Sequence, residues 1–146
     1  MHARKLAILA IDEGTSGTRA ALVAAYGSVC AVNYTPLVVA TPRHNVVEQD
    51  ADLVLQKTLE MCAKTIASAH DSGIEIAALA IATQRATGVL WDKVTGRALV
   101  PAMVWQDSRY AEELKPLAAV WDGKLVAQAG RPVGGRAGGS TRGSGS

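Results

Sequence analysis

The sequence lacks two features that would point to a membrane or a secreted protein: a long apolar run and a framework of cysteines. No apolar stretch among its 146 residues is long enough to span a bilayer, and no signal-peptide cleavage site follows the short basic N-terminus. It has only two cysteines, Cys30 and Cys62, far apart and without the spacing of metal ligands. Such a pair is typical of buried free thiols, so we expect a cytoplasmic protein with no membrane partner.

The sequence also lacks an excess of charge of either sign. The chain has 15 basic and 13 acidic residues, a net charge of +2. Residues 130–146 carry three of the arginines and no acid, which leaves 12 basic against 13 acidic residues, or −1, for residues 1–129. A nucleic-acid-binding face needs lysine and arginine clustered on folded elements, so no nucleic-acid partner is expected.

The composition changes sharply near residue 130. Over the whole chain, 49% of residues are hydrophobic and 19% charged, which is typical of a globular protein with a core. Residues 130–146, GRPVGGRAGGSTRGSGS, hold seven of the 14 glycines and almost nothing to bury. We therefore predict one domain at residues 1–129 and a disordered Gly/Ser/Arg-rich tail at 130–146. A truncation, a shifted reading frame and an engineered tail each account for such an end.

Strand-like runs dominate the first 40 residues. Residues 6–11 and 19–25 flank a glycine-containing turn, which predicts a β-hairpin, and residues 29–40 follow as a third strand. The apolar run at residues 75–83 is expected to form a strand covered on both faces, beside the first strand and parallel to it. Two more strands are predicted by the same kind of pattern: residues 88–92 and 98–105.

The hydrophobic period becomes helical after Asp50, a good N-cap residue. The helix predicted after this residue has an apolar stripe with spacings of four, three and four: Leu55, Leu59, Cys62 and Ile66. Residues 71–73 mark its end, and a second helix is predicted at residues 110–120, interrupted at Lys115-Pro116. Three strands, a helix and a buried strand make an α/β fold with a mixed sheet.

The turn between the first two strands has the composition of a phosphate-binding loop. Gly14 and Gly17 allow backbone N–H groups to approach a ligand closely. Three neighbours add hydroxyl groups: Thr15, Ser16 and Thr18. Arg19 adds a positive charge, and Asp12 is placed to hold the hydrated Mg²⁺ that accompanies a nucleotide. The same residue types are common in an ordinary hairpin turn, so the residues alone leave both interpretations open.

Three motifs follow one another in an informative order. They are AIDEGTSGTRAALV at residues 10–23, NVVEQDADLVLQKTLEMC at 45–62, and a segment at 76–109. The third contains a Gln-Arg pair, a Trp-Asp before a Thr-Gly turn, and the block VWQDSR. In this order they resemble the N-terminal part of the FGGY carbohydrate kinases, and especially glycerol kinases, in the actin-like ATPase superfamily. The match is collinear from about residue 6 to residue 109, and weaker to about residue 132.

The resemblance implies an RNase H-like α/β fold, of which this chain would hold an incomplete N-terminal domain. It implies ATP and Mg²⁺ as cofactors and a sugar or polyol as the acceptor, such as glycerol, a pentulose or a hexulose. By position, the nucleotide phosphates would be contacted by four residues of the hairpin: Thr15, Ser16, Gly17 and Arg19. Asp12 matches the acid near the magnesium.

Two residues match the acceptor site of that family. Arg85 matches an arginine that binds substrate hydroxyls, and Trp105 matches a tryptophan packed against the carbon chain. Without the resemblance, Arg85 would be expected to be an exposed loop residue and Trp105 a core residue. Ala86 stands where glycerol kinases have glutamate, which removes a hydroxyl acceptor and favours a different polyol or a ketose. The catalytic aspartate and the adenine-binding domain lie downstream in the family, so the 146 residues alone are expected to be inactive.

Two other interpretations stay open. The chain could be a non-catalytic module that binds phosphate or a partner, or it could belong to another actin-like ATPase, although QRATGVLWD and VWQDSR favour the carbohydrate kinases. Asp107 and Arg109 are expected to form a structural pair at the start of a helix. For the full-length protein we expect a homo-oligomer.

Overall fold

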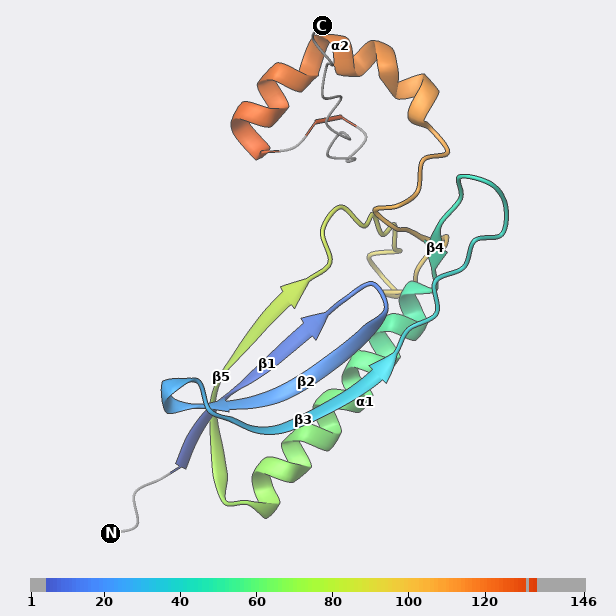
Figure 1. Ribbon diagram of the computed structural model, residues 1–146. Helices are drawn as coiled ribbons and strands as arrows, with labels where there is room; N and C mark the ends of the chain where they lie inside the picture. The colour runs from blue at the N-terminus through green and yellow to red at the C-terminus, as the bar shows by residue number, and fades with distance from the viewer. Residues whose placement is uncertain (1–4, 131, 134–146) are drawn as a thin grey trace, which may run out of the picture.

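A four-stranded mixed sheet with one long helix on its face forms the body of the molecule (Figure 1). The computed structural model describes residues 5–130, 132 and 133, so the predicted tail lies almost entirely outside the described residues. The strands are β1 (Lys5–Glu13), β2 (Gly17–Ala24), β3 (Val29–Pro36) and β5 (Ile74–Thr83). Their order in the sheet is β3-β2-β1-β5. A short 3₁₀ turn, η1 (Ala25–Gly27), connects β2 to β3.

The pairing of these strands confirms the predicted topology. β1 and β2 form an antiparallel hairpin, β3 adds antiparallel to β2, and β5 lies parallel to β1. A second small sheet consists of β4 (Glu48–Gln49) and β6 (Ala102–Met103), which pair antiparallel. The mixed α/β sheet expected from the sequence is therefore present.

Helix α1 (Ala51–Asp71) supplies the other half of the core. The Asp50 carboxylate accepts a hydrogen bond of 3.0 Å from the Leu53 N–H, which confirms the predicted N-cap. The helix ends at Asp71 with Ser72 as its C-cap, followed by Gly73 with a φ of 61°. Its inner face packs on alternate residues of the strands, in a cluster that includes Leu9, Ile11, Ala20, Met61 and Cys62.

The predicted apolar stripe of this helix is only partly correct. Cys62 is buried, but Leu55, Leu59 and Ile66 are 54%, 59% and 48% exposed. The residues that face the sheet are Met61, Cys62, Thr65 and Ala69. Small side chains at positions 65 and 69 let the helix approach the sheet closely. The predicted line of residues and the observed one both have helical spacing, so spacing alone does not show which of them faces the sheet.

The prediction that residues 75–83 are covered on both faces is wrong for the described part of the chain. β5 is an edge strand of the sheet, and Leu79 and Ile81 are 56% and 61% exposed. The cysteine prediction was also only half right. Both thiols are free, and burial raises the pKa of Cys62, but Cys30 is exposed because β3 is the opposite edge strand.

The segment from residue 84 to residue 110 is less regular than predicted. Instead of two full strands, it has isolated bridges at Gly88–Met103 and Trp91–Ala98, and β6 is only two residues long. Pro101 has no N–H to donate to a ladder, which limits the pairing. The third predicted strand is also shorter than expected, because β3 ends at Pro36.

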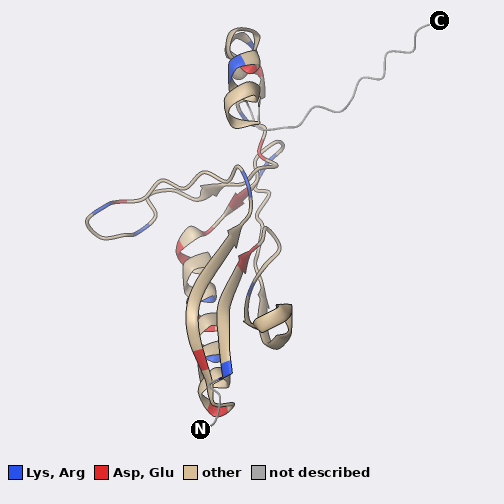
Figure 2. Cartoon of the chain, turned by 90° about the vertical axis from the view of Figure 1, so that its left-hand side faces the viewer, with Lys and Arg blue, Asp and Glu red and all other residues tan. Residues whose placement is uncertain are grey.

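Helix α2 (Ala111–Ala129) continues through Pro116, so the predicted interruption there is wrong. Proline removes one backbone hydrogen bond, and Figure 1 shows that the helix bends instead of ending. Both views place α2 beyond the end of the sheet (Figures 1 and 2). Figure 2 also shows basic and acidic residues interspersed along α1. Within the described residues, no helix is long and apolar enough to cross a membrane.

Candidate functional site

The tip of the β1–β2 hairpin is a tight turn with little room for a side chain at Gly14, whereas one at Gly17 would have to displace the exposed Tyr34 ring. The Gly14 N–H donates to the Gly17 carbonyl over 3.0 Å, and a Cβ added at Gly14 would lie 3.0 Å from that same oxygen. A Cβ added at Gly17 would lie 2.4 Å from the Tyr34 ring. Among the described residues, no backbone hydrogen bond engages the N–H of Thr15 or Ser16. These two donors are therefore available for an anion at the tip.

Asp12 and Arg19 form an ion pair close to the tip of the hairpin. They are cross-strand partners, with Arg19 Nε 3.2 Å from Asp12 Oδ2, and their side chains are about half exposed. The Arg19 guanidinium also lies 5.6 Å from the centre of the Tyr34 ring. An ion pair this exposed contributes little to stability, so a metal ion or a phosphate competes for either partner at small cost.

The two adjacent carboxylates of β1 point in opposite directions. Successive side chains of a strand alternate between faces, and the Glu13 carboxylate accepts a hydrogen bond from the Thr58 hydroxyl on α1. Asp12 therefore lies on the face away from α1, where its side chain is open to solvent. Of these two acids, Asp12 has the placement suited to a hydrated cation.

A ring of hydrogen bonds joins the hairpin tip to two other segments, and a third segment binds to it from outside. Thr15 Oγ1 donates to Gln84 Oε1 over 2.9 Å, and Gln84 Nε2 donates to Gln49 Oε1 over 2.8 Å. Gln49 Nε2 closes the ring by donating to the Thr15 carbonyl over 2.8 Å. From outside the ring, Trp105 Nε1 donates to Thr15 Oγ1 over 3.0 Å. The structure thus brings the predicted phosphate residue Thr15 and the predicted acceptor residue Trp105 into direct contact.

Trp105 also lines a cavity of about 570 Å³ between the 86–88 segment and α2. Ala86, Thr87 and Met103 form part of its wall, and Ala86 has a φ of 53°, a conformation that is uncommon for residues other than glycine. Arg85 is exposed and is not among the lining residues of this cavity. A common cleft for Arg85 and Trp105 therefore stays a prediction.

Comparison with known proteins assigns the family. The profile of the FGGY family of carbohydrate kinases, N-terminal domain, matches residues 7–132. The chain belongs to this family. It is 39% identical over 119 residues to a glycerol kinase of Acinetobacter baylyi, covering 82% of this chain and 24% of that protein. A glycerol kinase of Trichormus variabilis is 42% identical over 104 residues, covering 71% of this chain and 21% of the relative.

Solved structures show the same fold. A glycerol kinase of Plasmodium falciparum with ADP superimposes with a TM-score of 0.79 at 22% identity, over 88% of this chain and 26% of that one. A xylulose kinase of Rhodospirillum rubrum gives a TM-score of 0.76 at 24% identity, over 86% and 26%. The chain thus spans about a quarter of the length of the relatives it matches. This agreement confirms the predicted actin-like, RNase H-like class of fold.

Gln49 is the residue of this FGGY domain that the sequence analysis missed. It is only 2% exposed, although glutamine is seldom so buried. The available signal was its place in the VEQD motif directly before the Asp50 N-cap. Gln84 was noticed only as part of the Gln-Arg pair of the third motif, and it is half-buried in the ring.

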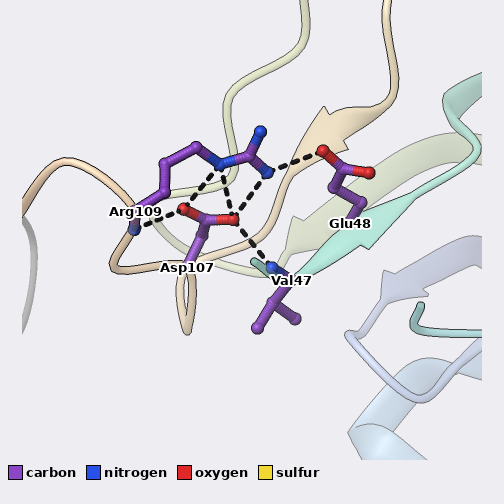
Figure 3. A network of polar contacts seen from close by, with 4 residues as sticks. All are labelled: Val47, Glu48, Asp107 and Arg109. Atoms are coloured by element: carbon purple, nitrogen blue, oxygen red, sulfur yellow. Dashed lines mark hydrogen bonds and ion pairs between the residues drawn. The ribbon is translucent and has the colours of Figure 1, made fainter. Parts of the chain in front are cut away.

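A second polar network joins Asp107 and Arg109 to Val47 and to Glu48 of β4 (Figure 3). Asp107 Oδ2 accepts hydrogen bonds of 2.7 Å from the Val47 N–H and from Arg109 Nη2. Arg109 Nη2 also donates to Glu48 Oε1 over 2.7 Å. The side chain of Asp107 is 1% exposed and that of Arg109 19% exposed. The predicted structural pair is confirmed, and it holds residues 104–109 against β4.

This network predicts a pH dependence of stability. The Arg109 guanidinium, together with the N–H groups of Val47 and Arg109, lowers the pKa of Asp107 to about 2, against the cost of its burial. The unfolded chain therefore binds a proton at Asp107 at a higher pH than the folded chain. We expect the stabilisation to be complete above the unfolded pKa of about 4 and to be lost as the pH falls towards 2. Urea unfolding at several pH values measures this slope, and Asp107→Asn should flatten it.

Proposed function

We propose that the chain is the N-terminal part of an ATP-dependent kinase that transfers a phosphoryl group to a hydroxyl of a sugar or polyol. The contact between Trp105 and Thr15 carries this proposal, because it puts the predicted acceptor wall one hydrogen bond from the predicted phosphate hairpin. The glycerol kinase relatives support the reaction class.

The hairpin would contribute to transfer by positioning. The N–H groups of Thr15 and Ser16 would bind phosphate oxygens, with Gly17 keeping the turn tight, and Arg19 would add positive charge once released from Asp12. Asp12 would hold the hydrated Mg²⁺, a cation that is bound through one or two carboxylates and keeps several of its waters. When bound, Mg²⁺ neutralises negative charge on the transferring phosphoryl group.

The acceptor would lie against Trp105, with Arg85 binding its hydroxyls. Ala86 lines the cavity beside Trp105 and offers no hydrogen-bond acceptor, unlike the glutamate expected at this position in a glycerol kinase. We therefore favour a polyol or ketose other than glycerol, such as a pentulose or a hexulose. In a longer protein containing this domain, Arg85→Ala should raise the KM for the acceptor far more than that for ATP.

The rest of the proposal concerns the whole protein. We place the general base and the adenine-binding domain outside these 146 residues, and we expect a homo-oligomer in the cytoplasm for the full-length kinase. The alternative is a module that binds phosphate or a partner without catalysis. This alternative is favoured only if the chain binds Mg-ATP and the protein encoded by the longer reading frame also shows no turnover.

The 146-residue chain should bind Mg-ATP weakly and should not turn over. We expect a Kd no tighter than about 1 mM, equivalent to about 4 kcal/mol, because the hairpin alone would supply contacts to the phosphates and none to the adenine. Calorimetry measures the Kd, which should rise in Asp12→Asn and stay unchanged in the exposed control Asp71→Asn. A coupled assay should detect no ADP release with glycerol, pentuloses or hexuloses. Substrate-dependent release that disappears in Asp12→Ala would contradict this expectation and show that the base lies within the chain.

A further inference from the structure

The hydrogen-bonded ring at the hairpin tip fixes the direction of each of its bonds. The Thr15 carbonyl can only accept, so Gln49 must present its NH₂ group to it and its Oε1 to Gln84. Gln84 must then present its own NH₂ group to Gln49 and its Oε1 to Thr15. Turning either amide over would place two acceptors, or two donors, face to face.

This direction determines what the Thr15 hydroxyl can do. Its single proton is donated to Gln84 Oε1, so its lone pairs are left for donors, and the Trp105 indole N–H uses one of them. A hydroxyl held this way cannot donate to a phosphate oxygen without breaking the ring. Thr15 therefore offers an anion its backbone N–H, and offers its hydroxyl oxygen only to groups that donate.

The burial of Gln49 makes the ring costly to break. Its side chain is 2% exposed, and both of its polar ends are used within the ring. A buried amide without partners is destabilised by the full loss of its hydration. The ring also connects positions far apart in the sequence: the hairpin tip, β4, the end of β5 and, through Trp105, the segment after β6.

We infer that Gln49 and Gln84 are positioning residues that orient the Thr15 hydroxyl as an acceptor and thereby seat the Trp105 indole on the hairpin tip. The consequence for phosphoryl transfer rests on the proposed function, since the ring would fix the distance between the phosphate hairpin and the acceptor wall. The orientation of Thr15 and Trp105 does not depend on that function, and it can be tested without any ligand.

The test uses Trp105 as the only fluorophore of its kind. The chain has three tryptophans, and Trp91→Phe with Trp121→Phe gives a parent in which only Trp105 emits at long wavelength. Gln49→Met keeps the side-chain volume but removes both hydrogen bonds. We expect it to shift the Trp105 emission maximum, to raise acrylamide quenching about twofold and to weaken Mg-ATP binding about fivefold, as expected for the loss of a buried hydrogen bond.

Gln49→Glu tests the direction of the bonds. Burial raises the pKa of a carboxyl at this position, so the side chain can be neutral under mildly acidic conditions. Ionised at about pH 7.5, it cannot donate to the Thr15 carbonyl and should behave like Gln49→Met; protonated at about pH 5.5, it can donate and should restore the parent emission. The parent, measured at both pH values, corrects for other titrations.

Thr65→Val is the matched control for stability. Thr65 is fully buried, donates to the Ala20 carbonyl and accepts from Asn33, away from the hairpin tip. It should lower stability in urea comparably while leaving Trp105 emission and quenching unchanged. A Gln49→Met chain with the parent's Trp105 emission and quenching would overturn the inference, as would a Gln49→Glu chain that acid does not restore. If the parent itself binds no Mg-ATP, the proposed function fails, while the ligand-free emission still decides the role of Gln49.

Discussion

Asp107→Ala is expected to lower the free energy of unfolding by about 3 kcal/mol, the range found when one partner of a buried ion pair is removed. The Asp107 side chain is 1% exposed and binds the Val47 N–H as well as Arg109. Its loss leaves that N–H without an acceptor and, within the described part of the chain, leaves Glu48 as the one remaining ionic partner of Arg109. Urea unfolding followed by circular dichroism measures the change.

The control for this prediction is an exposed aspartate, Asp71. Asp71 lies 3.5 Å from His70, but its side chain is 81% exposed, so Asp71→Ala should change stability by less than about 0.5 kcal/mol. An Asp107→Ala chain as stable as the Asp71→Ala chain would show that the network in Figure 3 does not hold residues 104–109 in place.

Leu22→Ala is expected to cost about 3 to 4 kcal/mol, because it removes a buried side chain and leaves a cavity. Leu22 is fully buried and packs with Ala7 and Ala69, whose side chains are too short to fill the space. The same substitution at Leu59, which is 59% exposed on α1, provides the matched control. Equal losses at the two positions would place Leu22 outside the core, and thermal unfolding of both chains would show it.

The hairpin and its parallel neighbour could be predicted because their signals are local. Alternation over six or seven residues, and a glycine turn, specify β1 and β2, and a run of apolar residues specifies β5. The Asp50 cap is local as well. The inner face of α1 could not be predicted in the same way, since two apolar lines run along this helix and the shape of the sheet decides between them.

In the candidate site, too, the residues found from the sequence are those with a local motif, and the ones missed depend on distant partners. Family motifs lead to Thr15 and Trp105, but the bond between them joins residues 90 positions apart, which no spacing rule reveals. Gln49 was missed because a glutamine before a helix is ordinarily exposed, and its burial depends on partners from the β1–β2 turn and from the residue that follows β5. The continuation of α2 through Pro116 was missed because a proline usually ends a helix pattern.

We propose that the β1–β2 hairpin binds the phosphates of a nucleotide. Backbone amide chemical shifts of the isotope-labelled chain, followed during a titration with Mg-ATP, report on this binding residue by residue. The amides of Thr15, Ser16 and Gly17 and the indole N–H of Trp105 should shift together, with one Kd of about 1 mM or weaker. Shifts confined to other parts of the chain, or unchanged hairpin amides at about ten times that concentration, would contradict the claim.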